Sequence, residues 1–157
     1  EFWMNLTSGG ALSSSDRLSV MSYSLSMNRA QNHIGEIKGS AGNSEPLIAG
    51  GIEGELTVTL KSNQDNTHFI NWNTEASLKT KLNLQGTQIG TGTNKSISIY
   101  IPHMVLVEAP DYSLTDPGMN PVTLKFKFFA LAANPTGMTS TMPYIEIVNT
   151  LATSLLA

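Results

Sequence analysis

The stretch KSISIYIP, Lys95–Pro102, shows most clearly what kind of fold this chain adopts. Isoleucine stands at every second position, with serine or tyrosine between. Successive side chains of an extended strand point to opposite faces, so this spacing predicts a strand with one apolar face and one polar face. Proline has no amide hydrogen to donate to a neighbouring strand, and we therefore predict that this strand ends at Pro102.

The same alternation recurs on both sides of this stretch. In Met21–Met27 every second residue is large and apolar, and the residues between are serines. In Val122–Leu131 valine, leucine and phenylalanine share one face, whereas Lys125 and Lys127 share the other. Further strands are expected at Glu55–Lys61, Ser77–Leu84, Met104–Glu108 and Tyr144–Thr150.

Segments rich in glycine, proline and asparagine separate the predicted strands. The longest is 28–53, in which a short strand at His33–Lys38 is the one regular element expected. A loop of this length inside a compact domain is usually functional or disordered. Shorter turns and loops are expected at Gly86–Thr93, Ala109–Asp111, Asp116–Gly118 and 133–143.

One short helix is expected after residue 64. The Asp65 carboxylate is suited to accept hydrogen bonds from the free amides of a first helical turn. Phe69, Trp72 and Ala76 follow at spacings of three and four, which is the apolar stripe of an amphipathic helix. We expect this aromatic face to lie across the sheet.

Together these segments predict a mainly β fold, an antiparallel β-sandwich or barrel with one flanking α-helix, in a single domain over 1–157. Residues 1–17 show no sustained period and are expected to form an N-terminal arm or loop. Phe2 and Trp3 would be poorly placed on a solvated tail, so they either dock on a neighbouring subunit or belong to a strand. The sequence begins at Glu1, and we expect a trimmed protein or one module of a longer chain.

The composition favours a protein that assembles. Hydrophobic residues make up 40% of the chain and charged residues only 13%, about half the charged fraction that is usual in soluble proteins. A surface that is buried against other copies does not need charged residues. A secreted or simply Ser/Thr-rich β-domain would have a similar composition, and this alternative stays open.

The charge pattern and the cysteine count argue against several classes of protein. The net charge is −3 and no run of basic residues occurs, which argues against a protein that grips nucleic acid. The chain has no cysteine, so the fold depends on packing and hydrogen bonds, as suits a reducing cytoplasm. No apolar run approaches the ~18 residues of a membrane span, and we expect no membrane partner.

We find no arrangement of residues that predicts catalysis. His33, His68 and His103 lie in separate segments without a metal-ligand spacing, and each is expected at the surface or at a cap. Glu53 and Glu55 share a strand face but are interpreted as solvated residues. The glycine-rich stretch Gly86–Gly92 lacks the lysine of a phosphate loop, and no GxSxG motif is present. We therefore expect no enzyme, and no catalytic, metal or cofactor site.

The C-terminal third resembles a known family. KSISIYIP leads through HMVLVEAPDYSLTDPG to VTLKFKFFALAANPTG, and the order ends on PYIEIVNTL, Pro143–Leu151. With GIEGELTVTLKSNQ, Gly51–Gln64, and the helix that carries Trp72, this resembles the tail tube (major tail) proteins of long-tailed bacteriophages. The likeness covers about two thirds of the chain. It lies in the order of these segments and in their residue pattern, because none of the motifs is highly specific.

The resemblance implies a structural protein of the virion that is made in the host bacterial cytoplasm. Six chains, or three chains of two modules each, would close into a ring, and rings would stack into a tube with other tail proteins. Genome DNA would pass through transiently, without sequence recognition. The long loop 28–53 would reach the next ring. Phe2, Trp3, Lys125 and Lys127 are the expected interface residues, with the two lysines paired to Glu or Asp.

Two other functions stay open at this stage. A secretion-system tube protein, such as the type VI tube protein, would share the architecture but pass proteins. A carbohydrate-binding or adhesin-like β-sandwich would need exposed aromatic residues on one face, and Trp72, Tyr100 and Tyr112 are the candidates. We expect Trp72 to lie in the core instead.

Overall fold

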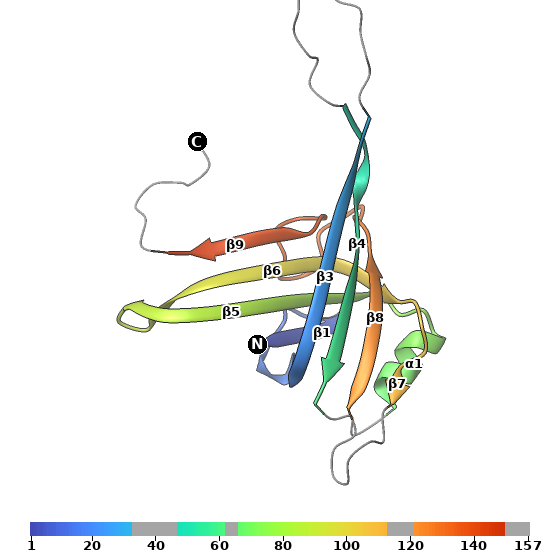
Figure 1. Cartoon of the computed structure of the whole chain (residues 1–157), viewed down its shortest axis with the longest axis horizontal. Helices are drawn as coiled ribbons and strands as arrows, with labels where there is room; N and C mark the ends of the chain where they lie inside the picture. The colour runs from blue at the N-terminus through green and yellow to red at the C-terminus, as the bar shows by residue number, and fades with distance from the viewer. Residues whose placement is uncertain (33–46, 62–65, 113–120, 150–157) are drawn as a thin grey trace, which may run out of the picture.

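The computed structural model describes residues 1–32, 47–61, 66–112 and 121–149. These residues form strands joined by loops, one 3-10 helix and one α-helix (Figure 1). In chain order the elements are β1 Phe2–Leu6, η1 Ser14–Asp16, β2 Arg17–Leu18, β3 Val20–Asn32, β4 Leu47–Leu60, α1 Thr67–Asn73, β5 Leu78–Gly90, β6 Thr93–Leu106, β7 Asp111–Tyr112, β8 Val122–Phe128 and β9 Tyr144–Val148.

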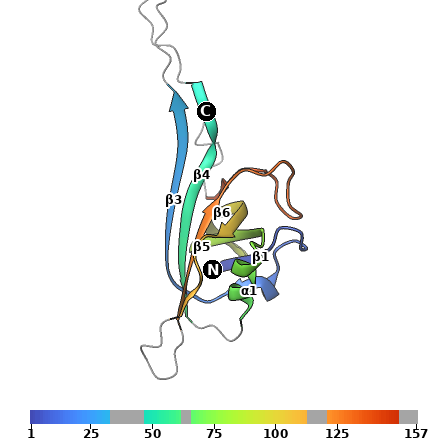
Figure 2. The ribbon, with the colours of Figure 1, turned by 90° about the vertical axis from the view of Figure 1, so that its right-hand side faces the viewer.

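All the strands belong to one antiparallel sheet that folds over on itself. The order of strands is β2-β1-β5-β6-β8-β4-β3, with β9 also paired to β6 and β7 also paired to β8. Strands β3, β4 and β8 form one layer, and they cross over β5 and β6 of the second layer (Figures 1 and 2). The predicted class, mainly β with one flanking helix, is confirmed.

The turn from one layer to the other lies in β6, near Pro102. Residues Ser96–Tyr100 pair with β9, whereas Met104–Leu106 pair with β8. Between these two parts Thr80 faces Ile101 and Leu78 faces Met104, so β6 holds one residue more than β5 does. Such a bulge bends a strand and tolerates a residue without an amide hydrogen. Pro102 therefore lies inside β6, and the prediction that it ends the strand is wrong.

The core lies between the two layers and takes one face of each strand. The alternation predicted for Val122–Leu131 is confirmed over β8, where the apolar side chains are buried and Lys125 and Lys127 are exposed. The other members of this core cluster come from β1, β4, β5 and β6: Phe2, Met4, Leu56, Val58, Leu60, Leu78, Leu82, Ile101, Met104 and Leu106. Burying one such side chain contributes about 1.5–3 kcal/mol to folding.

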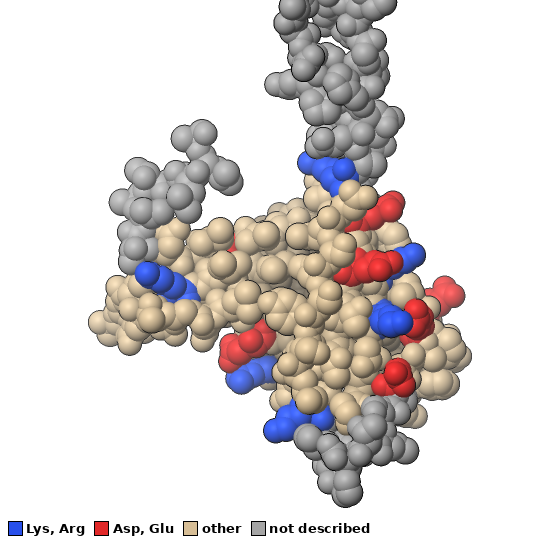
Figure 3. All heavy atoms as spheres, viewed as in Figure 1, with Lys and Arg blue, Asp and Glu red and all other residues tan. Residues whose placement is uncertain are grey.

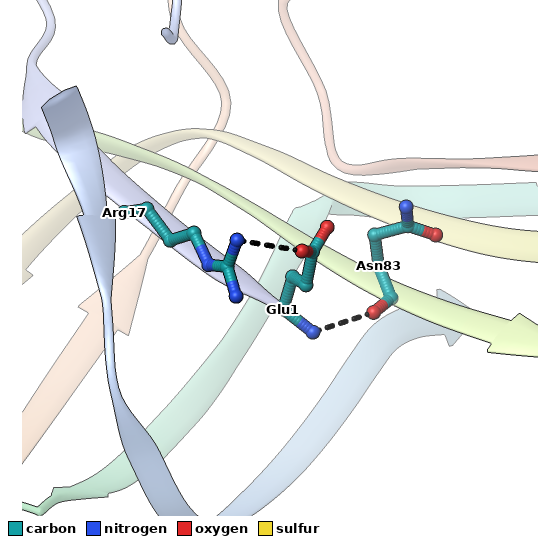
Figure 4. Close-up of polar contacts among 3 residues, drawn as sticks. All are labelled: Glu1, Arg17 and Asn83. Carbon is teal, nitrogen blue, oxygen red and sulfur yellow. Dashed lines mark hydrogen bonds and ion pairs between the residues drawn. The ribbon is translucent and has the colours of Figure 1, made fainter. Parts of the chain in front are cut away.

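The N-terminal residues form part of the sheet rather than an arm. Strand β1 pairs with β5 and β2, and Phe2 is 1% exposed in the core. The ladder continues through Glu1, whose nitrogen donates a hydrogen bond to the Asn83 carbonyl oxygen at 2.8 Å while its carboxylate binds Arg17 at 2.9 Å (Figure 4). The alternative that Phe2 and Trp3 belong to a strand is therefore confirmed.

Strands extend into two of the expected loops. Strand β3 extends to Asn32 and β4 begins at Leu47, so both enter the segment 28–53; the predicted strand His33–Lys38 lies outside the described residues. Strand β5 likewise runs to Gly90, which leaves a turn at residues 91–92. Gly92 has a φ of 75°, a conformation that glycine adopts at little cost.

The predicted helix is present but begins at Thr67, with Asn66 at its N-cap position. Asp65, the expected N-cap, lies outside the described residues, as does the predicted turn Asp116–Gly118. Trp72 packs against the core as expected, and Phe69 does not. Residues 133–143 form the expected loop, since no strand is assigned between β8 and β9.

Candidate functional site

An apolar shelf extends beyond the point where the two layers cross. Strands β5, β6 and β9 continue past β3 (Figure 1), and the side of these strands that faces the core elsewhere has no cover here. Register places Leu84 opposite Ile97 and Ile97 opposite Ile147, so the three side chains share one face. We define the shelf as the four large apolar residues exposed on this face: Leu84, Ile97, Ile145 and Ile147. A hollow of about 370 Å³ lies between Leu84, Ile97 and Ile147.

Strand β3 carries a second apolar surface, the β3 stripe, which consists of Met21, Tyr23 and Met27. Tyr23 faces Val58 and Met27 faces Gly54, so both side chains lie on the core side of the layer. The predicted alternation is present over Ser22–Met27, and a register shift between Val20 and Ser22 interrupts it at Met21. The expected dry face is only partly covered, by contacts at Leu25. A hollow of about 410 Å³ between Met27, Ile99 and Ile145 joins the stripe to the shelf.

A third apolar surface, the helix-side patch, lies on the opposite side of the molecule (Figure 1). It consists of Phe69 and Ile70 on α1 and of Val107 after β6. A hollow that Trp72 and Val107 both line connects the helix with the end of β6. The members of the shelf, the β3 stripe and the helix-side patch are each 41–57% exposed.

Two strands next to these surfaces have an open edge. Within the described residues β3 pairs only with β4, over almost its whole length, and β9 pairs only with β6. The free amides and carbonyls of such an edge can form hydrogen bonds with a strand of another chain. Open edges therefore adjoin both the β3 stripe and the shelf.

The outer side of β3, β4 and β8 is polar, and we call it the hydroxyl face. Three rows cross these strands: Ser22, Thr59 and Thr123; Ser24, Thr57 and Lys125; Ser26, Glu55 and Lys127. Charged residues gather over the β4–β8 region and are sparse on the projecting part of β5, β6 and β9 (Figure 3). The hydroxyls predicted opposite the apolar positions thus face away from the core.

Both lysines of the hydroxyl face have carboxylate partners within the chain. The Nζ of Lys125 donates a hydrogen bond of 2.7 Å to Oε2 of Glu108, and that bond raises the pKa of Lys125. The Nζ of Lys127 lies 3.9 Å from Oε1 of Glu55. The expected pairing with glutamate is present, but both partners belong to the same chain. Whether either lysine also contacts another subunit stays a prediction.

The outer side of β1, β5 and β6 is covered by loops rather than open. Lys79 is buried there, and its Nζ donates hydrogen bonds of 2.9 Å to the carbonyl oxygens of Gly9 and Thr136. Burial lowers the pKa of Lys79, and the nearby Asp16 carboxylate partly offsets this effect. One buried ammonium group thus holds two loops that are far apart in the sequence.

The aromatic residues form no open platform among the described side chains. Tyr100 stacks on Tyr144 with ring centroids 4.6 Å apart, and Lys81 lies 5.1 Å from the centroid of Tyr100 and 5.4 Å from that of Trp3. Both neighbours of the Tyr100 ring are therefore side chains of the chain itself. Trp72 packs against the core, and the Tyr112 side chain lies outside the described residues.

The remaining predicted residues do not come together in one place. Phe2 is buried in the core of its own chain, and Trp3 is half-buried beside Lys81. His68 is a buried residue of α1 rather than a surface residue, and His103 is half-buried beside Phe129. His33 lies outside the described residues.

The described part of the chain shows neither a metal-binding cluster nor a membrane-spanning helix. It contains no group of three His, Cys, Asp or Glu residues that could hold a metal ion. No helix in the same residues is long and apolar enough to cross a membrane. Glu53 and Glu55 are exposed on the hydroxyl face, as expected of solvated residues.

The residue pattern of the sequence does not reveal the shelf or the helix-side patch. The alternation of Ile145 and Ile147 with Glu146 indicates an apolar face, but it does not tell whether the same chain covers that face. No protein-family model matches the sequence, and no curated protein matches it. The resemblance to tail tube proteins therefore remains a prediction.

Proposed function

We propose that this chain is a structural subunit that assembles with copies of itself into rings, which stack into a tube of the phage-tail type. The observation that carries the proposal is the continuous apolar surface of the shelf and the β3 stripe, bordered by the open edges of β3 and β9. Soluble monomers rarely expose large contiguous apolar surfaces or long open strands, because both promote association.

The position of the apolar surfaces supports a head-to-tail contact. The projecting ends of β5, β6 and β9, which carry the shelf, lie at the left of Figure 1, and α1, which carries Phe69 and Ile70 of the helix-side patch, lies at the right. Strand β3, which carries the β3 stripe, crosses between them. Contact between two different surfaces repeats from copy to copy, and it closes into a ring when the rotation between copies allows it. We therefore propose that the helix-side patch of one subunit covers the shelf of the next.

The layer that carries the hydroxyl face has a suitable size to line such a ring. It consists of β3, β4, β8 and the end of β6 that pairs with β8. Six copies would give about 24 strands, and strands ~4.8 Å apart with a tilt of ~40° would form a barrel with a backbone diameter of ~48 Å. Three copies would give ~24 Å, which side chains would narrow below the width of duplex DNA. Six copies of this single module therefore suit the passage of a genome.

The chemistry of the hydroxyl face also suits a conduit. Serine and threonine keep a lumen wet, and the lysines are paired with glutamates. Unpaired basic residues would bind phosphate groups and slow the passage of DNA. We propose that the hydroxyl face lines the lumen and that the core and covering loops lie outside it.

Two single substitutions test the head-to-tail contact. Ile147→Lys places a charge on the shelf, and Phe69→Lys places one on the helix-side patch; we expect each variant to sediment as a monomer. An equimolar mixture retains one intact surface of each kind and should form dimers but no rings. Glu146→Lys, at the neighbouring position on the opposite face of β9, is the control and should assemble like the unmodified protein. A mixture that stays monomeric would contradict the contact.

A further inference from the structure

We propose that Glu108 and Glu55 mask Lys125 and Lys127, so that a polyanion moving along the hydroxyl face meets neither of these two lysines as a free cation. This inference rests on the proposed function, in which DNA passes along that face. The inference gives a function to the two exposed ion pairs, whose four residues the fold does not require. The two pairs have N–O distances of 2.7 Å and 3.9 Å.

Stability does not explain these pairs. The four side chains are 49–69% exposed, and ion pairs at that exposure add little to the stability of a protein because water and salt screen them. Their effect on the field outside the protein is larger. A lysine held against a carboxylate offers a passing phosphate much less attraction than a free lysine does.

The neighbouring carboxylates extend the masking. Glu53 shares the outer face of β4 with Glu55, and Asp111 on β7 also acts on Lys125 electrostatically. Four carboxylates thus accompany two lysines on this part of the face. Lys125 stays protonated because Glu108 raises its pKa, so pairing, and not loss of the proton, has to offset its charge.

Assembly would multiply the effect of removing the masks. With two lysines in each of six copies, one ring would offer about twelve cations to a duplex. A protein that makes 6–10 phosphate contacts loses about 10³–10⁵-fold in affinity between 50 and 200 mM salt. Unmasked rings should show a salt dependence of this order, whereas masked rings should show almost none.

The test compares four forms of the protein: unmodified, Glu55→Gln/Glu108→Gln, a control Glu75→Gln/Glu146→Gln with the same change in net charge elsewhere, and the unmasked form with Lys125→Gln/Lys127→Gln added. Binding of a short fluorescent DNA duplex is measured by anisotropy at about 50 and 200 mM salt. We call Glu55→Gln/Glu108→Gln the unmasked form. At low salt it should bind the duplex at least ~100-fold more tightly than the control does, and at high salt it should release the duplex. Removal of the two lysines should abolish that binding.

Equal DNA binding by the unmasked form and the control would overturn the masking proposal. Strong binding by the unmodified protein would overturn it as well. Electron micrographs of the same samples report on the proposed function separately. If rings are seen but the masks have no effect, the inference fails and the proposed function stands. If no rings are seen, the proposed function fails. The masking proposal is then still decided by comparing the DNA affinity of Glu55→Gln/Glu108→Gln with that of the control Glu75→Gln/Glu146→Gln.

Discussion

Gly54 shows how closely strand residues are set by their neighbours on both sides. It faces Met27 on β3 and Phe128 on β8, and a Cβ atom at this position would overlap the Phe128 ring and the backbone oxygen of Ser26. The ring can rotate, but the backbone oxygen cannot move without breaking the β3–β4 pairing.

We therefore expect Gly54→Ala to lower the free energy of unfolding by about 1–3 kcal/mol, the usual cost of overpacking. Gly86→Ala is a matched control, because the nearest atom to its Cβ would lie 3.5 Å away, which is an ordinary contact. That variant should be neutral or gain about 0.4–1 kcal/mol. Denaturant unfolding measures both; equal effects would show that the close approach at Gly54 is not a constraint.

His103 makes stability depend on pH. Burial lowers the pKa of His103 below 6.5, and its Nδ1 has no hydrogen-bond partner among the described residues. As the pH falls through 6.5, the unfolded imidazole binds a proton before the folded one does, so acidification favours the unfolded state. The contribution levels off below the folded pKa.

Unfolding curves at pH 7.5 and 5.5 should thus show lower stability at the acidic pH, and His103→Gln should reduce the difference between them. A difference that the substitution leaves unchanged would assign the effect to other groups.

At the scale of elements, β8 is a strand whose alternate side chains are buried in the core. It lies between β4 and the end of β6, and Phe126 faces both Leu56 and Leu106. Phe126→Ala should cost about 3–5 kcal/mol, as is usual for a buried phenylalanine. Lys127→Ala, one position along, should cost less than about 1 kcal/mol, because its side chain is exposed. Calorimetric melting of the two variants tests this contrast, and similar losses would contradict it.

The sequence predicts which segments are strands better than it predicts where they end. The alternation found β3, β4, β5, β6, β8 and β9, because one apolar face per strand is a local property. Pro102 and Gly86 do not end their strands, because β5 and β6 continue through a register shift at each of these positions, next to Ile101 for the first and between Gln85 and Gln88 for the second. The partners of a strand lie far away in the chain, and local residue preferences do not contain them.

The same limit explains why the candidate surfaces could be predicted only in part. The division of serines and apolar residues on β3 predicts two different faces, and both are present. Whether Ile147 is covered depends on how far β5, β6 and β9 project past β3. That distance is set by the way the whole sheet folds over on itself (Figure 2). Phe2 was expected at an interface because its partners in β5 could not be recognised from the sequence.

At the scale of the whole molecule, the shelf, the β3 stripe, the helix-side patch and the open edges of β3 and β9 lie outside a well-formed core in the described part of the chain. The fold thus satisfies its interior but leaves apolar surface that a second copy would cover. The hydroxyl face is the outer side of β3, β4 and β8, and none of the members of the three apolar surfaces belongs to its rows. These features together favour a closed assembly with a wet, weakly charged inner wall.

Negative-stain electron microscopy of the purified protein at high concentration tests this account most directly, with Ile147→Lys prepared in parallel. We predict rings of six copies, or stacks of such rings, for the unmodified protein and separate monomers for the variant. An unmodified protein that stays monomeric at the highest concentration reached would contradict the central claim that these surfaces and edges serve self-assembly.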